Sequence, residues 1–395
     1  MNYLNLIPVS FLCVCLLACG NKAKLVPIEL IANNTNNLPV WALGDFVRPE
    51  GMNPVITPNP ESKFDCPMRK APVGWEESDT FNPAAVVKDG KICVLYRAED
   101  NSATGIGKRT SCLVGSEMCI RDRIGLAESV DGVTMERHAT PVMFPAEDNM
   151  KEFEWQGGCE DPRVAVTEDG LYVMMYTAWN RDVPRLSVAT SRDLLTWEKH
   201  GPAFAKTYDG RFKDMACKSG SIVTKVVDGK QVITKVNGKY LMYWGEQMVA
   251  AATSDDLITW TPVLNDQNEL LGLIYPRDNY FDSALTECGP PAIMTDKGIL
   301  LLYNGKNQKD DRRDPRFNAG TYSAGQVLFD LNDPYKAIAR LDVPFFQPMA
   351  DFEKSGQYVD GTVFIEGLVF FKDKWYLYYG CADSKVGVAI YTPTL

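Results

Sequence analysis

Acidic residues stand where predicted strands begin or end in this 395-residue chain. The segment "WQGGCEDPRV" places Glu160 and Asp161 side by side, directly before an apolar run. Comparable positions elsewhere hold Asp79, Glu99, Asp100, Glu246, Glu287, Asp360 and Asp383, with Arg97 and Arg163 near them. Converging carboxylates can cleave a glycosidic bond, because one protonates the leaving oxygen while another activates water or attacks the anomeric carbon.

The amino-acid composition limits the classes of molecule that the protein can bind. A net charge of −10 disfavours nucleic acids, whose phosphates are held mainly by Lys and Arg. His138 and His200 are the only histidines, and neither has a neighbour that suggests a metal ligand. We therefore expect no nucleic-acid partner, no metal and no cofactor. The 17 Tyr, 17 Phe and 8 Trp residues suit sugar stacking and a β-rich core equally well.

Five similar segments indicate how the chain positions these carboxylates. Each has a polar turn followed by a strand that is rich in aromatic and β-branched residues. The strands end near Tyr96, Tyr176, Tyr243, Tyr303 and Tyr379. About four strands recur in each repeat without a convincing amphipathic helix, so the sequence predicts an all-β fold, a five-bladed β-propeller. Equivalent strand ends would then surround one mouth of a central channel.

Three regions are expected along the chain. Residues 1–19 resemble a lipoprotein signal peptide that ends in "LLAC", with Cys19 as the lipidated residue, although no Lys or Arg precedes the apolar stretch. A plain secretion signal or a misplaced start codon is the alternative. Residues 20–74 form an N-terminal arm with Trp41 and Phe46 buried, and 75–395 form the catalytic propeller. We expect the mature protein in a bacterial cell envelope, anchored to a membrane by lipid.

Residues 112–122, "CLVGSEMCIRD", interrupt a pattern that reads smoothly without them. They resemble a translated sequencing-adaptor fragment, so we expect an artefactual insertion. A surface loop between blades is the alternative.

Four motifs carry a resemblance to a known family. "YRAED", "GGCEDPRV", "ECGPPAIMTDKGILLLYNG" and "YYGCADSKVGVAIYTP" occur in this order over residues 75–393. Together they resemble glycoside hydrolase family 130, five-bladed propellers that act on β-mannosides, most of them as phosphorylases and some as hydrolases. The resemblance implies that Asp161 is the general acid, in a family where the proton can travel through a sugar hydroxyl.

The resemblance also implies a sugar-binding set. Arg97, Glu99, Asp100 and Asp383 would hydrogen-bond the mannose hydroxyls. We expect the other substrate-binding residues to be Arg163, Asn180, Asn304 and Asp360.

Two departures from the phosphorylase pattern favour the hydrolytic branch. Phosphorylases of the family typically show "YHG" where this chain has Asn304 in "YNG". Glu246 and Glu287 are carboxylates where a phosphorylase needs cations, and they would repel phosphate in a partly desolvated pocket. Either could instead activate water, so the sequence predicts an exo-acting, inverting β-mannosidase, with β-1,2 as the expected linkage and Asp161, Glu246 and Glu287 as catalytic residues.

Two other functions remain open. A mannoside phosphorylase could assemble a cationic pocket from Arg185, Lys213 and Lys218, although we expect these to be surface charges. A non-catalytic glycan-binding lipoprotein would turn its carboxylates out of the channel. The sequence leaves open a homo-oligomer and the choice between Glu246 and Glu287 as the base.

Overall fold

The computed structural model describes residues 30–31, 38–101 and 122–393, and strands dominate them. Helical structure is limited to α1 (Lys151–Glu154) and two 3₁₀ turns, Tyr208–Gly210 and Asp351–Glu353. None of the described helices is long and apolar enough to cross a membrane. The prediction of an all-β protein is thus confirmed at the level of fold class.

The largest sheet joins two antiparallel groups. The first group contains β5 (Asp79–Lys88), β6 (Lys91–Glu99), β7 (Asp122–Ser129) and β8 (Glu136–Arg137). The second contains β9 (Gly158–Val166), β10 (Tyr172–Trp179), β11 (Pro184–Ser191) and β12 (Glu198–Pro202). A parallel pairing of β7 with β9, Asp122 opposite Gly158, connects them. Asp122, the last residue of the expected insertion, therefore belongs to a strand; 112–121 lie outside the described residues.

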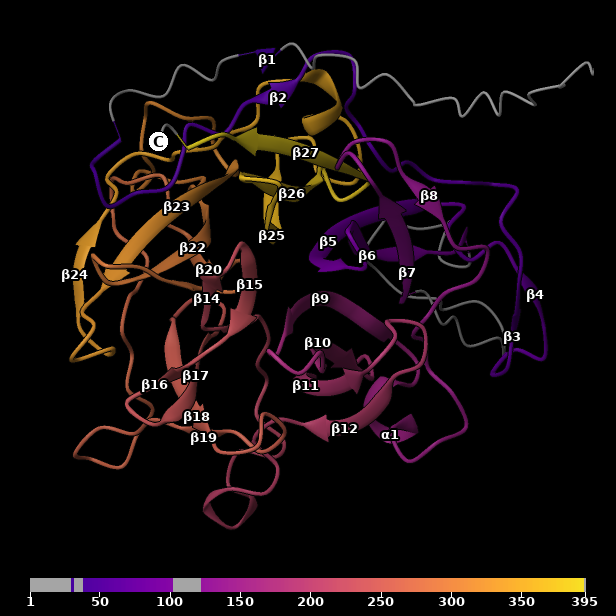
Figure 1. Cartoon of the computed structure of the whole chain (residues 1–395), viewed down its shortest axis with the longest axis horizontal. Coiled ribbons are helices and arrows are strands. Elements are labelled where there is room, and N and C mark those ends of the chain that lie inside the picture. The colour runs from indigo at the N-terminus through magenta and orange to yellow at the C-terminus, as the bar shows by residue number, and fades with distance from the viewer. Residues whose placement is uncertain (1–29, 32–37, 102–121, 394–395) are drawn as a thin grey trace, which may run out of the picture.

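The remaining long strands form three further sheets. One holds β13 (Gly220–Ile222), β16 (Lys235–Val236), β17 (Lys239–Trp244), β18 (Ala250–Ser254) and β19 (Thr261–Pro262). The next holds β14 (Thr224–Val227), β15 (Lys230–Ile233), β20 (Leu285–Cys288), β21 (Ile293–Met294), β22 (Ile299–Lys306), β23 (Tyr322–Phe329) and β24 (Ala337–Arg340). The last holds β25 (Val363–Phe371), β26 (Lys374–Cys381) and β27 (Lys385–Tyr391). Strands β5, β9 and β25 lie toward the middle of the view in Figure 1.

The N-terminal segment packs against the end of the chain. Short pairs are formed by β1 (Leu30–Ile31) with β2 (Arg48–Pro49) and by β3 (Phe64–Cys66) with β4 (Ala71–Val73). Val47 bridges to Ile390 in β27. Phe46 is fully buried, as expected, whereas Trp41 is only partly buried.

Hairpin turns explain why the strands recur. Between β5 and β6, Asp89 and Gly90 have φ values of 50° and 75°, the left-handed conformation that tight two-residue hairpins require. Asp and Gly tolerate this conformation better than most residues, which is why the polar turns of the sequence mark the hairpins.

The repeated tyrosines anchor the strands from inside. All five are buried, and four donate their hydroxyl to a buried carboxylate: Tyr96 to Glu76, Tyr176 to Glu154, Tyr303 to Asp282 and Tyr379 to Glu353. Tyr243 differs, because it donates to the carbonyl of Pro334 at 2.8 Å. The repeat in the sequence thus corresponds to a repeated buried hydrogen bond, which ties each tyrosine strand to a segment that connects strands.

Candidate functional site

A polar cavity of about 600 Å³ brings together all three predicted catalytic residues, Asp161, Glu246 and Glu287. Its wall includes Asn82, Arg97, Asp161, Lys218, Glu246, Glu287, Lys306, Lys309, Tyr322, Tyr358, Phe364 and Asp383. These residues come from all the long sheets, at or near strand ends. Asp161, Glu246, Glu287 and Asp383 therefore face one space, as the sequence predicts, whereas Asp79, Glu99, Asp100 and Asp360 are not part of this wall.

Asp161 reaches the cavity because the backbone of β9 is irregular. Glu160 pairs with Thr177 and Arg163 with Met175, so Asp161 and Pro162 form a bulge opposite Tyr176. Asp161 has a φ of 49°, and Asn82 in β5 has a φ of 46° at a similar bulge that also precedes a proline. Asn82 Nδ2 donates to Asp161 Oδ1 at 2.8 Å. Two equivalent bulges therefore aim two polar side chains at each other.

Arg97 gathers four carboxylates around one guanidinium. Its nitrogens lie 2.8 Å from Asp122, 3.0 Å from Asp161, 3.1 Å from Glu160 and 3.3 Å from Glu99. Burial opposes ionisation of Asp161, but Arg97, Lys218 and Asn82 outweigh it and lower the pKa of Asp161 to about 2. Burial raises the pKa of Glu160. The pKa values of the adjacent acids are thus shifted in opposite directions, and Asp161 is a carboxylate before substrate binds.

The same cavity wall pairs a cation with the two predicted bases. Lys218 Nζ lies 3.5 Å from Glu246, and Ser219 donates a short hydrogen bond to Glu287. Burial and the charge of Glu246 raise the pKa of Glu287 to about 7. Lys218 is not the surface charge that the sequence analysis expects, because its side chain is 25% exposed and belongs to the cavity wall. Arg185 and Lys213 lie elsewhere, near Phe153.

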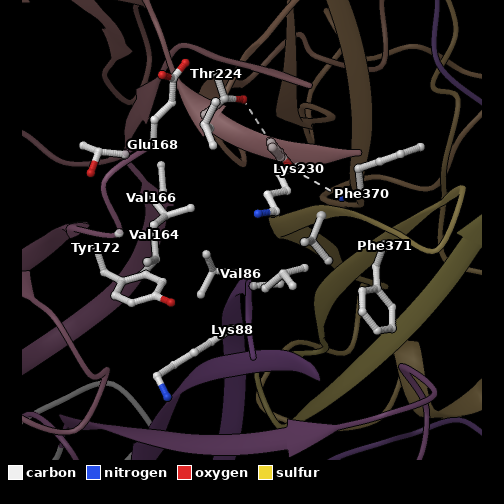
Figure 2. A pocket seen from close by; sticks show the side chains of 18 of the residues that line it. Val86, Lys88, Val164, Val166, Glu168, Tyr172, Thr224, Lys230, Phe370 and Phe371 are labelled. Carbon is white, nitrogen blue, oxygen red and sulfur yellow. Dashed lines mark hydrogen bonds between the residues drawn. The ribbon is translucent and has the colours of Figure 1, made fainter. Parts of the chain in front are cut away.

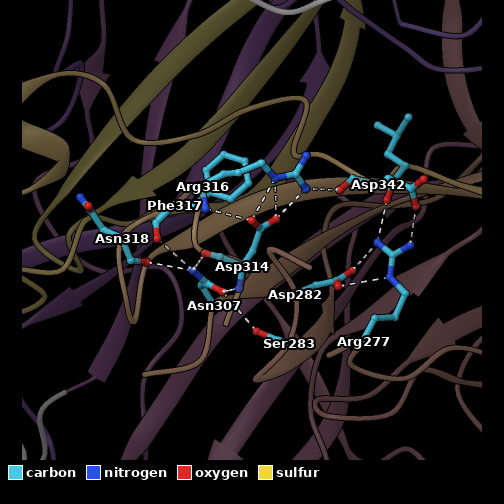
Figure 3. A network of polar contacts seen from close by, with 10 residues as sticks. Arg277, Asp282, Ser283, Asn307, Asp314, Arg316, Phe317, Asn318 and Asp342 are labelled. Atoms are coloured by element: carbon cyan, nitrogen blue, oxygen red, sulfur yellow. Dashed lines mark hydrogen bonds and ion pairs between the residues drawn. The ribbon is translucent and has the colours of Figure 1, made fainter. Parts of the chain in front are cut away.

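The long loop after β22 supplies further cations. Asn307 is buried and accepts hydrogen bonds from the Asp314 amide at 2.8 Å and from Ser283 at 3.2 Å, as Figure 3 shows. Its Nδ2 donates to the Asp314 carbonyl at 3.0 Å. These contacts fix the loop beside Lys306 and Lys309 on the cavity wall. Lys306 Nζ lies 4.7 Å from the ring centre of Tyr322, a cation–π contact on the cavity wall.

Several predicted substrate-binding residues lie away from the cavity. Asn304 is fully buried and exchanges hydrogen bonds with the backbone of Ile365. Asn180 caps its own loop by accepting from the amides of Asp182 and Val183. The prediction that these two asparagines bind substrate is not supported by their positions, because their amide groups hold the backbone.

The remaining predicted residues lie near the cavity or behind it. Asp100 is buried and pairs with Arg123 at 2.9 Å, whereas Asp360 pairs with Lys309 at 2.6 Å, next to the wall. Glu99 reaches the site through Arg97. Arg163 is 1% exposed and lies behind the wall.

Sequence reasoning missed Asn82, Ser219 and the cavity position of Lys218. The signal for Asn82 was present, because "NP" at 82–83 stands at the same place in its repeat as "DP" at 161–162. Ser219 also has a positive φ, 66°, just before β13. No comparable pattern marks Lys218 in the sequence.

Comparisons with known proteins agree on the family. A model described as beta-1,4-mannooligosaccharide phosphorylase of glycoside hydrolase family 130 matches residues 51–394. The 1,2-beta-oligomannan phosphorylase of Thermoanaerobacter sp. (strain X514) is 34% identical, over 82% of this chain and 93% of the relative. The beta-1,2-mannobiose phosphorylase of the same organism is 30% identical, over 80% and 91%.

A solved structure is more similar. It shares 63% identity and a TM-score of 0.86, over 91% of this chain and 96% of that chain. It is described with the statement that this family of mannoside phosphorylases contains glycoside hydrolases that target beta-1,2 mannosidic linkages in Candida mannan.

The curated relatives contradict the predicted hydrolysis, because they are phosphorylases of β-1,2-linked mannosides. The prediction treated Glu246 and Glu287 as fixed negative charges. In the structure Lys218 lies beside them, and a Glu287 with a pKa near 7 is partly neutral at neutral pH. The two glutamates are therefore compatible with phosphate. The matched motifs, the family model and the relatives together show that this chain belongs to glycoside hydrolase family 130.

Proposed function

We propose that this chain is a β-1,2-mannoside phosphorylase, which transfers a terminal mannosyl unit to inorganic phosphate. The observation that carries the choice of phosphate is Lys218, a cation on the same cavity wall as Asp161, Glu246 and Glu287. A phosphate oxygen could take the place of the Glu246 contact at Lys218. The curated relatives support the same reaction and the same linkage.

Glu287 assists phosphate binding in its protonated form. Its carboxyl group, when neutral, can donate a hydrogen bond to a phosphate oxygen, whereas the ionised group would repel it. Lys306 and Lys309 add positive charge to the same cavity. Phosphate is thereby placed opposite Asp161, with the sugar between them.

The reaction exchanges one bond at the anomeric carbon for another. The glycosidic carbon–oxygen bond breaks, a bond to a phosphate oxygen forms on the opposite face, and the leaving sugar oxygen gains a proton. Dihydrogen phosphate carries a proton into the reaction, so the proton balance closes although Asp161 starts as a carboxylate. Because phosphate attacks from the face opposite Asp161, the proton is exchanged through solvent: the attacking phosphate releases its proton to solvent, and Asp161 takes one up from solvent when substrate binds. We assign Asp161 the delivery of this proton to the leaving oxygen, directly or through a sugar hydroxyl. Arg97, Asn82 and Asp383 bind the hydroxyls of the mannosyl unit.

We also propose the finer architecture and the location. The sheets are the blades of a five-bladed propeller over 75–395, with 20–74 as an arm, and the cavity is one mouth of its channel.

The protein is exported and lipid-anchored at Cys19, which lies outside the described residues. Mass spectrometry of the membrane fraction would test the anchor by detecting a lipidated N-terminal Cys19; an unmodified residue in a soluble protein would contradict it.

Product analysis tests the proposed function. Purified protein is incubated with β-1,2-mannobiose, with and without inorganic phosphate, and the products are separated by chromatography. We expect mannose and mannose 1-phosphate in equal amounts, formed only with phosphate. Free mannose alone, at a rate independent of phosphate, would contradict phosphorolysis, and the absence of product from every mannoside would indicate a binding protein.

A further inference from the structure

Glu366 is a buried carboxylate for which the reaction gives no role. It lies in β25, where Ile365 pairs with Tyr379 and Gly367 with Tyr378, so that Glu366 is the extra residue of a bulge. Asn82 occupies a bulge beside the corresponding tyrosine of its own repeat, Tyr96. Glu366 lies one residue deeper along its strand and is 0% exposed.

Arg163 is the ionic partner of Glu366. Its Nη2 lies 3.1 Å from Glu366 Oε1, and the two oxygens of Glu366 have no hydrogen-bond partner among the described residues. Arg163 also donates to the carbonyls of Asp161 at 3.1 Å, Cys288 at 2.8 Å and Gly289 at 2.9 Å. One guanidinium thus holds the bulge that presents Asp161 and the backbone that follows Glu287.

The same guanidinium lies between two carboxylates. Arg163 Nη2 is 4.0 Å from Glu287 Oε1, farther than it is from Glu366. Burial raises the pKa of Glu366, Arg163 lowers it, and Asp161 and Glu287 raise it further, while Arg97 lowers it. Glu287 in turn faces Glu246, Lys218 and Arg163. Glu366 and Glu287 therefore compete for the positive charge of Arg163.

We propose that Glu366 is a positioning residue that acts through Arg163: it holds Nη2 of the guanidinium closer to itself, at 3.1 Å, than to Glu287, at 4.0 Å, and so limits the pairing of Arg163 with an ionised Glu287. The consequence for catalysis rests on the proposed function, because a neutral Glu287 matters if phosphate binds there. The contact itself does not depend on which nucleophile the enzyme uses.

The test measures the protonation of Glu287 without any activity. Free energies of unfolding are determined from about pH 5 to about pH 9 for wild type, Glu287→Gln, Glu366→Gln and the double variant. Glu287 has a folded pKa near 7 against an ordinary value of 4.5, so its ionisation costs stability progressively as pH rises between these values. The difference between wild type and Glu287→Gln isolates this loss.

In the Glu366→Gln background we expect the loss to end about one pH unit lower, a tenfold change in the proton affinity of Glu287. An unchanged pH dependence would overturn the proposal. If Glu366→Gln does not fold, Glu366→Met provides a second neutral side chain of similar length, with the same expected shift.

Glu353→Gln is the matched control. Glu353 is 0% exposed and pairs with Arg48 at 2.6 Å, and the described wall of the polar cavity contains neither residue. We expect this variant to lower stability. The pH dependence of the stability difference that Glu287→Gln causes should not move. If Glu353→Gln shifts this pH dependence as much as Glu366→Gln does, the loss of any buried ion pair has the same effect and the proposal fails. Failure of phosphorolysis would appear only in the product analysis.

Discussion

The inner strands bound two cavities that differ in their lining: one gathers the predicted catalytic carboxylates, and the other mixes valines with charged side chains such as Lys88 and Lys230. The polar cavity contains Asn82 of β5 and Asp161 of β9. A second cavity of about 400 Å³ lies at the other ends of the same strands, where Val86, Val164 and Val166 line it together with the end of β25 (Figure 2). Between the two cavities, in sequence, lie Arg163 on β9 and Glu366 on β25.

The difference lies in the backbone. At the polar cavity the strands carry bulges and residues with positive φ. Beside the valines, β5 pairs with β6 and β9 pairs with β10 in regular antiparallel register. A regular strand alternates its side chains, and a bulge re-aims one of them. The proposed catalytic residues therefore lie where bulges interrupt the pairing of the strands, whereas the regularly paired ends contribute to stability.

The largest effect should come from Asp161, which the bulge presents. Asp161→Asn retains the shape of the side chain but not its ability to carry a proton, so kcat should fall roughly 10²- to 10⁴-fold. Steady-state kinetics on β-1,2-mannobiose measure this. Asp282→Asn, a buried aspartate outside the cavity wall, should lower stability and retain most activity. Near-normal turnover by Asp161→Asn would remove Asp161 from the mechanism.

Lys218 should affect the binding of phosphate more than the binding of the sugar. Lys218→Met removes the cation beside Glu246, so the KM for phosphate should rise about tenfold or more, a loss of ~1.4 kcal/mol. The KM for mannobiose should change much less. Lys213→Met is the matched control, because Lys213 lies over Phe153, away from the cavity wall, and should leave both constants unchanged. Equal effects of the two variants would argue against a phosphate site at Lys218.

The raised pKa of Glu287 predicts a pH dependence. Below its value of about 7 the carboxyl group is protonated and can donate to phosphate, and above it the charge repels phosphate. The KM for phosphate should therefore rise with pH more steeply in wild type than in Glu287→Gln, which stays neutral. Comparison of the two proteins removes the titration of phosphate itself. Parallel pH profiles would show that Glu287 does not face phosphate.

The smallest effect on activity should come from the valine-lined end. Val86→Ala removes two methyl groups from the wall of the second cavity and should cost roughly 1 to 3 kcal/mol of unfolding free energy. Because the regular end serves stability, kcat should stay within about twofold of wild type. Denaturant unfolding and mannobiose kinetics on the same sample measure both. A large loss of kcat would erase the functional distinction between the two cavities.

Local patterns made part of this molecule predictable. The Asp89–Gly90 turn and the repeated tyrosines gave the strands, and the equivalence of strand ends placed Asp161, Glu246 and Glu287 together. Other features depend on tertiary contacts that sequence spacing does not encode. Asn304 stands in place of a histidine of the phosphorylase motif, yet its amide is hydrogen-bonded to the Ile365 backbone. The position of Lys218 depends on how neighbouring sheets meet.

The protonation states of Glu246 and Glu287 were the hardest feature to predict. Treating both side chains as charged led to the wrong choice of reaction. In the sequence Glu246 and Glu287 are two negative charges. In the structure, burial and their proximity raise the pKa of Glu287. The net charge of the site thus depends on contacts between β20, the end of β17 and Lys218, which are far apart in the sequence.

The reverse reaction tests phosphorolysis most directly. Phosphorolysis conserves the energy of the glycosidic bond, so the enzyme supplied with mannose 1-phosphate and mannose should form β-1,2-mannobiose and release inorganic phosphate. Phosphorus NMR follows the phosphate, and chromatography identifies the disaccharide. We expect both products in equal amounts, and neither with Asp161→Asn. If wild-type protein degrades mannobiose but forms no disaccharide from mannose 1-phosphate, the account of the phosphate site is contradicted.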